Sequence, residues 1–122
     1  MDITLARMNA RRVHEFFRRN WPPFSAVAVD WENLLPSPEP EPARIEGFVR
    51  RFIFSPTVLV HVDRKIGGEF ELSEAVRFLC PYIGRYQIRV APRDFSAFVV
   101  IATPGVGAGL IAPLTEAVEN AG

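Results

Sequence analysis

The sequence predicts an α+β protein in which a mixed sheet of about four strands is flanked by three or four helices. Two kinds of spacing support this class: apolar residues recur at helical intervals in some segments, and alternate or run continuously in short β-branched segments elsewhere. The predicted order is helix, strand, helix, strand, helix, strand, strand, helix, and a three-layer α/β sandwich is the alternative. The 122 residues are 48% hydrophobic, enough to bury a core within one domain covering 1–122.

The N-terminal third of the chain predicts a helix, a strand and an extended loop. Residues 5–20 place apolar side chains on one helical stripe, and a Trp-Pro-Pro sequence at 21–23 ends the helix. Residues 26–30 are short, β-branched and bounded by breakers, as is typical of a strand. Residues 36–42 read Pro-Ser-Pro-Glu-Pro-Glu-Pro, and prolines, which fix φ and lack N–H donors, keep this stretch extended. We therefore expect an acidic, proline-rich loop over residues 34–43.

The middle of the chain predicts the clearest helix and the clearest strand. Apolar residues at i, i+3, i+4, i+7 and i+8 from Ile45 predict a helix over 43–54, and a Ser-Pro sequence ends it. Valines alternate with other residues over 57–62, so this segment forms a strand with two different faces. Residues 69–72 pair back with it as a short edge strand.

The last third predicts a helix, two strands and a closing helix. Ser73 is the expected cap of the third helix, Pro81 kinks or restarts it near Cys80, and Gly84 ends it. Two strands, 87–91 and 95–102, form a hairpin, and the second is apolar on both faces, so we expect it at the centre of the sheet. A glycine-rich loop over 104–109 then precedes a closing helix over 110–121.

Composition limits the classes of function. Fourteen basic residues balance fourteen acidic ones, so no overall charge draws the chain to nucleic acid or to a membrane. The single cysteine, Cys80, cannot form an internal disulfide, and no apolar run approaches the roughly 20 residues of a membrane helix, which predicts a cytoplasmic protein. Thirteen of the basic residues are arginine, a composition typical of a bacterial gene of high GC content.

The residue types that most often carry chemistry favour structural roles in this chain. The glycines in 105–109 do not match a dinucleotide-binding motif, which needs its third glycine at position 110, where Leu110 stands. No Gly-Lys-Ser or Gly-Lys-Thr is present either, so we expect a turn here rather than an anion site. Cys80 lies on an apolar stripe, His61 lies within a strand, and His14 is at an unrelated spacing, so we predict neither a nucleophile nor a zinc site. We expect no catalytic residue, metal or cofactor.

Two short segments resemble the NYN-domain ribonucleases, which are PIN-like metal-dependent enzymes. Residues 27–33, Val-Ala-Val-Asp-Trp-Glu-Asn, are similar to the first strand of that family, and residues 98–102 are similar to its later central strand. The resemblance implies that Asp30 helps to hold a magnesium ion. Phosphodiester chemistry needs several carboxylates around the cation, and Asp63 and Asp94 are the further candidates. A degenerate ribonuclease using Asp30 is therefore one alternative function.

A second alternative is a nucleic-acid-binding domain that uses the segment 77–93. Basic and aromatic residues interleave there, as in surfaces on which bases stack on rings while arginines contact phosphates. The candidate contacts are Arg85, Tyr86, Arg89 and Arg93. The neutral charge of the whole chain argues against this function.

The function that the sequence favours is a non-enzymatic protein-binding module. Such a role needs no catalytic constellation, only a rigid body that presents an aromatic anchor with a charged rim. The sequence has the character of a small bacterial inhibitor or immunity-type protein that neutralises a toxin, and an acidic surface would suit a basic partner such as a nuclease. The predicted contacts are Trp31, Glu32, Leu34, Glu39 and Glu41.

Overall fold

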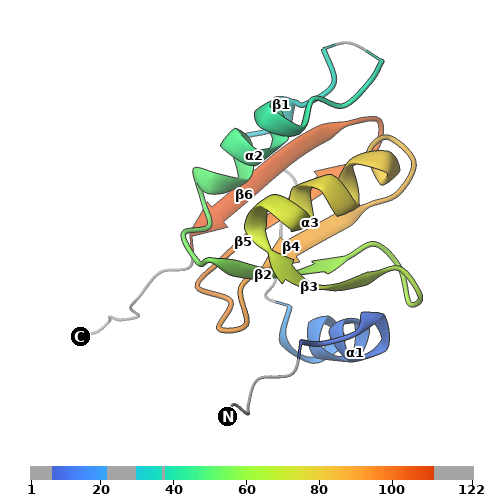
Figure 1. The fold of residues 1–122 in the computed structure, drawn as a ribbon. Coiled ribbons are helices and arrows are strands. Elements are labelled where there is room, and N and C mark those ends of the chain that lie inside the picture. Colours follow the sequence, from blue (N-terminus) through green and yellow to red (C-terminus); the bar gives the residue numbers. More distant parts are fainter. Residues whose placement is uncertain (1–6, 22–29, 37, 112–122) are drawn as a thin grey trace, which may run out of the picture.

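The computed structural model describes residues 7–21, 30–36 and 38–111, which form an α+β fold with helices on both faces of one sheet (Figure 1). The six strands lie in the order β1-β6-β5-β4-β2-β3, and every neighbouring pair is antiparallel. The predicted class is confirmed, but the sheet has six strands rather than four and is not mixed. The elements are α1 (Ala10–Asn20), β1 (Glu32–Asn33), α2 (Pro42–Arg50), β2 (Thr57–His61), β3 (Gly67–Glu71), α3 (Leu72–Leu79), the 3-10 turn η2 (Cys80–Tyr82), β4 (Ile88–Ala91), β5 (Ala97–Ala102) and β6 (Val106–Ile111).

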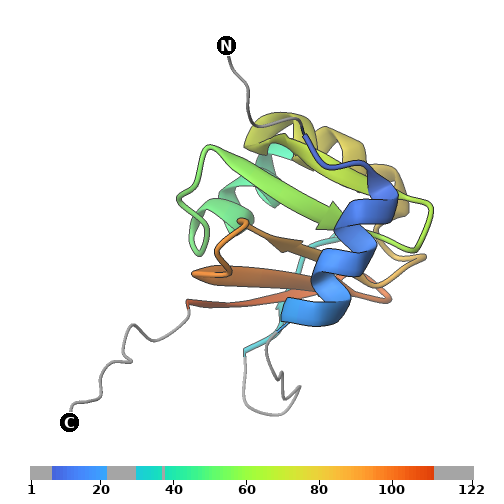
Figure 2. The same ribbon diagram turned by 90° about the horizontal axis from the view of Figure 1, so that it is seen from below.

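The sheet separates two hydrophobic clusters. Helices α2 and α3 cover one face and α1 crosses the other (Figures 1 and 2). The alternation predicted for β2 is confirmed, because Val58 and Val60 belong to the cluster under α2 and α3, whereas Leu59 belongs to the cluster under α1. Strand β5 alternates in the same way between the two clusters and is an inner strand of the sheet, as its continuous apolar sequence predicts.

The loop predicted over 104–109 is confirmed as a turn at Pro104 and Gly105, but from Val106 on the segment is instead the start of β6. Gly107 and Gly109 occur at the two-residue spacing of one strand face. A Cβ on Gly107 would lie 2.6 Å from a methyl carbon of Leu34, and one on Gly109 would lie 2.5 Å from the ring of Phe52. These glycines are therefore required because α2 and its flanking residues pack directly on the backbone of β6. The prediction of a closing helix over 110–121 is wrong for Leu110 and Ile111, which belong to β6. Residues 112–121 of that prediction lie outside the described residues.

Several boundaries also differ from the sequence predictions. Helix α1 begins at Ala10, where Asn9 caps it by accepting the Arg12 amide N–H at 3.0 Å. Glu71, not Ser73, caps α3, since Glu71 and Glu74 form a reciprocal capping box. The restart at Pro81 is confirmed as η2. The strand predicted over 26–30 lies outside the described residues except for its last position.

The N-terminal segment is fastened to the edge strand β3 through Glu69. The Glu69 backbone N–H donates to the Met8 carbonyl at 3.1 Å, and the Glu69 carboxylate accepts the Met8 amide N–H at 3.0 Å. The Arg93 guanidinium donates two further bonds to the same carboxylate, at 2.8 and 2.6 Å. Chiefly through the hydrogen bond from Arg93, the pKa of Glu69 is held below its usual range. This carboxylate therefore joins β3, the β4–β5 turn and the entry to α1.

We expect Glu69→Gln to lower the free energy of unfolding at pH 7 by about 1–2 kcal/mol, because it removes the charge that holds Arg93, while that side chain, 38% exposed, can rehydrate. Because the folded-state pKa of Glu69 is depressed, its contribution is complete above about 4.5 and is lost as the pH falls through the folded-state value. Urea denaturation should therefore show the two proteins converging in acid. Arg18→Gln, which breaks an exposed pair with Glu15, is the control, and an equal loss there would contradict this role for Glu69.

Candidate functional site

A hollow of about 490 Å³ lies where the end of α2 passes over the outer part of β6, and we call it the Trp31 hollow. The pairing of Glu32 with Gly107 brings residues 30–32 alongside β6. On the other side, one further turn after α2, in which the Phe52 amide N–H donates to the Val49 carbonyl at 3.0 Å, carries the Phe52 ring over Gly109. The lining residues are Asp30, Trp31, Glu32, Arg51, Phe52, Gly109 and Leu110.

The Arg51 guanidinium is held in place at the rim of the hollow. One of its nitrogens donates to Glu32 at 2.5 Å, and its central carbon lies 5.1 Å from the Phe48 ring centroid and 5.5 Å from that of Phe52. Both partners of the ion pair are substantially exposed, so the pair itself adds little stability. The ion pair instead fixes the orientation of the Arg51 guanidinium, so that this planar cation lies beside an apolar surface without being buried in it.

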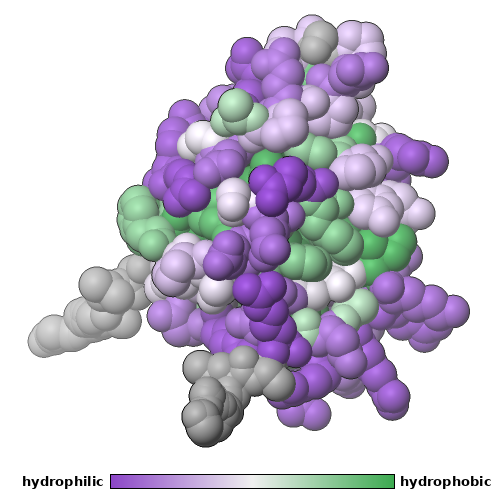
Figure 3. All heavy atoms as spheres, viewed as in Figure 1, coloured by the Kyte–Doolittle hydropathy of each residue, from purple (hydrophilic) through white to green (hydrophobic). Residues whose placement is uncertain are grey.

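Apolar side chains continue from the hollow onto the surface. Leu110 is 36% exposed, Ile111 56% and Phe54, in the connection after α2, 79%. The end of β6 and this connection lie on the same side of the molecule (Figure 1), where Figure 3 shows apolar side chains gathered at the left of the view. Trp31 is half-buried and packs against the cluster under α1, so it forms a fixed wall at the edge of the sheet.

The structure brings together only part of the predicted partner-binding set. Trp31 and Glu32 line the hollow. Leu34 is fully buried in the core under α2 and adds no accessible surface. Glu39 and Glu41 lie before the start of α2, whereas the hollow lies at its end, and the nine residues of the helix separate the two ends by about 13 Å. The hollow also contains Arg51, Phe52 and Leu110, which the sequence did not predict as site residues. The alternate glycines of 105–109 are the signal that could have found them, because such spacing is typical of a strand on which large side chains rest.

The alternative nucleic-acid residues do not form one free basic surface. Arg93 is engaged by Glu69. The guanidinium of Arg89 lies 5.3 Å from the Trp21 ring, and burial lowers its pKa. Arg85 and Tyr86 are exposed in the connection before β4, where the Tyr86 ring packs edge-on to that of Tyr82 at 5.6 Å.

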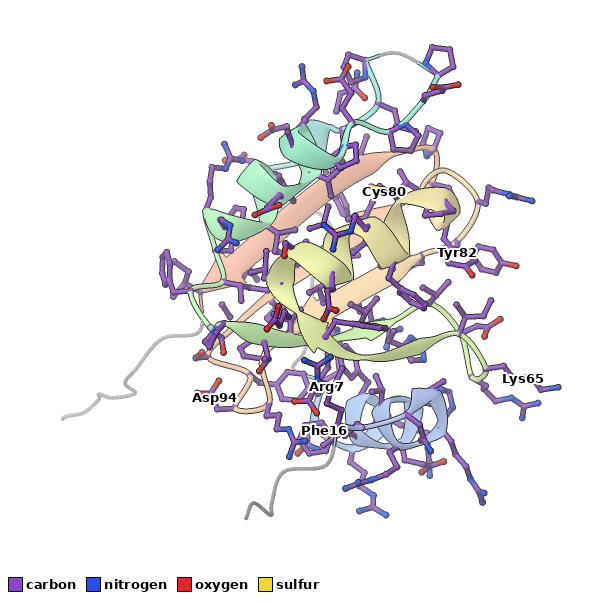
Figure 4. The ribbon with its side chains drawn as sticks, in the orientation of Figure 1. Arg7, Phe16, Lys65, Cys80, Tyr82 and Asp94 are labelled. Carbon is purple, nitrogen blue, oxygen red and sulfur yellow. The ribbon has the colours of Figure 1, made fainter. Side chains whose placement is uncertain are left out.

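The acids proposed from the ribonuclease resemblance are dispersed. Asp63 accepts the Lys65 amide N–H at 2.7 Å, and Asp94 accepts that of Ser96 at 3.0 Å, so each stabilises its own turn. Figure 4 shows Lys65 and Asp94 on turns at opposite ends of the sheet. Asp30 lines the Trp31 hollow. Across the described ranges, no group of three or more His, Cys, Asp or Glu side chains could hold a metal ion.

The cysteine is buried, and the two histidines are half-buried where α1 meets β2. Cys80 is buried, which raises the pKa of its thiol and leaves it as a small apolar group. The Nδ1 atom of His14 lies 2.9 Å from Nε2 of His61, so one ring donates to the other across the contact of α1 with β2. Burial lowers the pKa of His61 to about 4, and its Nδ1 is buried without a hydrogen-bond partner in the part of the chain that is described.

Of the helices in the described ranges, none has the length and apolar character needed to cross a bilayer. Comparison with protein-family models, curated proteins and solved structures finds no match to this chain.

Proposed function

We propose that this protein is a non-enzymatic protein-binding module that docks its partner over the Trp31 hollow. The observation that carries the proposal is the gathering of Trp31, Phe52 and the oriented Arg51 around one concavity, next to exposed apolar residues at the end of β6. Tryptophan, arginine and large aromatic side chains in a preformed pocket are the residues that most often carry binding energy in protein interfaces.

The charge around this surface supports a basic partner. Asp30 and Glu32 line the hollow, and Glu39 and Glu41 lie at the far end of α2. Arg51 pairs with Glu32 and Arg44 pairs with Glu41, so these four acids and two arginines together carry a net charge of −2. An interface of ordinary size, about 800 Å² on each partner, is wide enough to cover both groups. Proline at alternate positions from 36 to 42 restricts the loop before α2, so docking there costs little conformational entropy. A toxin-neutralising, immunity-type role toward a basic protein such as a nuclease is the specific form that we propose.

The test uses the product of a neighbouring gene, because an immunity-type protein is expected beside its toxin. We expect the purified neighbour to bind the wild-type protein in a calorimetric titration, and Trp31→Ala to weaken binding at least 30-fold through loss of the aromatic anchor. Since Trp31 also packs against the core, Leu110→Asp supplies a second variant at a surface position, and it should weaken binding while leaving thermal unfolding nearly unchanged.

Tyr86→Ala is the matched control, since Tyr86 is an exposed aromatic residue, 37% accessible, that does not line the hollow. It should leave the affinity unaltered. Wild-type affinity in both Trp31→Ala and Leu110→Asp would remove the Trp31 hollow from the interface.

A further inference from the structure

The outward face of α1 carries an excess of positive charge. Arg11, Arg12, Arg18 and Arg19 are all exposed, whereas Val13 and Phe17 on the opposite side of the helix are fully buried. Arg18 pairs with Glu15 at 2.7 Å. In the described part of the chain, Arg11, Arg12 and Arg19 have no ion pair, although Arg19 acts on Glu15 at longer range. We call Arg11, Arg12, Glu15, Arg18 and Arg19 the basic face; its net charge is +3 in a chain whose formal net charge is zero.

A second hollow, of about 480 Å³, runs along this face. Its lining includes three arginines of the basic face together with the half-buried Phe16, whose ring stacks on Phe95 at 5.6 Å. Figure 4 shows Phe16 where α1 meets the rest of the molecule. Both ends of the helix are fixed, by the Asn9 cap and by the Trp21 amide N–H donating to the Phe17 carbonyl at 2.9 Å. The arginine backbones are therefore held at constant spacing on a rigid helix.

We propose that the basic face binds duplex DNA, with its arginines contacting the phosphates on both sides of the major groove. Arg11 and Arg19 are eight residues apart, about 12 Å along the helix axis, which is close to the width of the major groove. Guanidinium groups bind phosphate oxygens through two parallel hydrogen bonds. Phosphate contacts of this kind carry no sequence information, so the binding is independent of sequence.

A protein partner fits this face less well than DNA does. The centres of protein interfaces are depleted of charge, whereas interfaces with DNA are more polar and much more positive. The basic face offers guanidinium groups around one half-buried ring and no exposed apolar patch of its own. The basic face lies on α1, and the hollow along it shares no lining residue with the Trp31 hollow, so this activity does not depend on the proposed function.

The test is fluorescence anisotropy with a labelled duplex of arbitrary sequence, titrated with the full chain between 20 and 200 mM salt. Three phosphate contacts predict a slope of about −2.7 for the logarithm of the binding constant against the logarithm of salt concentration. The triple variant Arg11→Gln, Arg12→Gln, Arg19→Gln should lose at least tenfold in affinity at the lowest salt, and its slope should fall toward zero. Its thermal unfolding should stay close to that of the wild-type protein, because all three side chains are exposed.

The control is a second triple variant with the same change in charge at exposed arginines away from α1: Arg44→Gln, Arg77→Gln, Arg85→Gln. It should keep wild-type affinity. Equal losses in both triple variants would show an effect of net charge alone and overturn the proposal, as would no binding at 20 mM salt. Tighter binding to polyglutamate or to single-stranded DNA of equal charge would assign the face to another kind of polyanion and would overturn it too.

Discussion

As the pH falls from 6.5 to about 4, the wild-type protein should lose about 2–3 kcal/mol of its free energy of unfolding through His61 alone. His61 packs between the rings of His14 and Phe17, and burial is the main cause of its low pKa, with Arg89 and His14 acting in the same direction and Asp63 against them. The unfolded chain takes up a proton near pH 6.5, whereas the folded chain does so only near 4. Protonation therefore favours the unfolded state within this window, and the loss stops below it.

Urea denaturation of wild type and His61→Phe, at intervals of half a pH unit, measures this effect. The variant keeps an aromatic ring in the stack but has no group to titrate, so its stability should change much less between pH 6.5 and 4. His14→Gln retains His61 and should retain most of the pH dependence, because burial is the largest cause of the shift. Parallel curves for wild type and His61→Phe would show that His61 does not titrate as proposed. The loss below pH 4.5 that involves Glu69 should appear in both proteins.

The largest effect of a single substitution is expected at Gly107. A Cβ there would approach Leu34 at 2.6 Å and the Phe48 ring at 2.8 Å, and the position is buried between β1 and β5. Gly107→Val should therefore lower the free energy of unfolding by about 3 kcal/mol or more, the upper range for overfilled cores. In a thermal or urea unfolding experiment this variant should be the least stable of those described.

A control and a double-mutant cycle separate this packing effect from the general effects of replacing glycine. A Cβ at Gly47, within α2, meets nothing within 4 Å, so Gly47→Ala should stabilise the helix by about 0.5–1 kcal/mol. In the cycle of Gly107→Ala with Leu34→Ala, the smaller residue makes room for the added methyl group, so the double variant should be more stable than the sum of the single effects by about 0.5–3 kcal/mol. Additive effects would mean that Gly107 does not contact Leu34.

Local patterns predicted the interior of this fold better than its edges. The alternation in 57–62 predicted the two faces of β2, because side-chain spacing in a strand depends on the backbone alone. The apolar run in 97–102 predicted the inner position of β5, since both of its faces are apolar. Helix α2 was similarly evident from its apolar spacing. β1 and β6 were missed, since a two-residue strand and a run of glycines have almost no apolar periodicity, and their pairing depends on contacts distant in sequence.

The candidate site was predictable only where its residues adjoin in sequence. Trp31 and Glu32 were identified from the composition of one segment, but Arg51 and Leu110 reach the same hollow from α2 and β6. Leu34, three residues after Trp31, was expected at the surface and lies instead in the core because it rests on Gly107. Arg89 and Arg93, predicted as nucleic-acid contacts, are instead engaged by residues distant in sequence: Arg89 by Trp21 and Arg93 by Glu69.

The position of β6 has a consequence for synthesis on the ribosome. This strand is synthesised after all the other described elements, yet it lies between β1 and β5, and Phe48 and Phe52 rest on it. Until residues 106–111 have left the exit tunnel, the nascent chain displays these rings without a surface to cover them. The layer under α2 therefore cannot close before β6 has emerged, and in that interval the emerging polypeptide is a natural client for a chaperone that shields exposed aromatic groups.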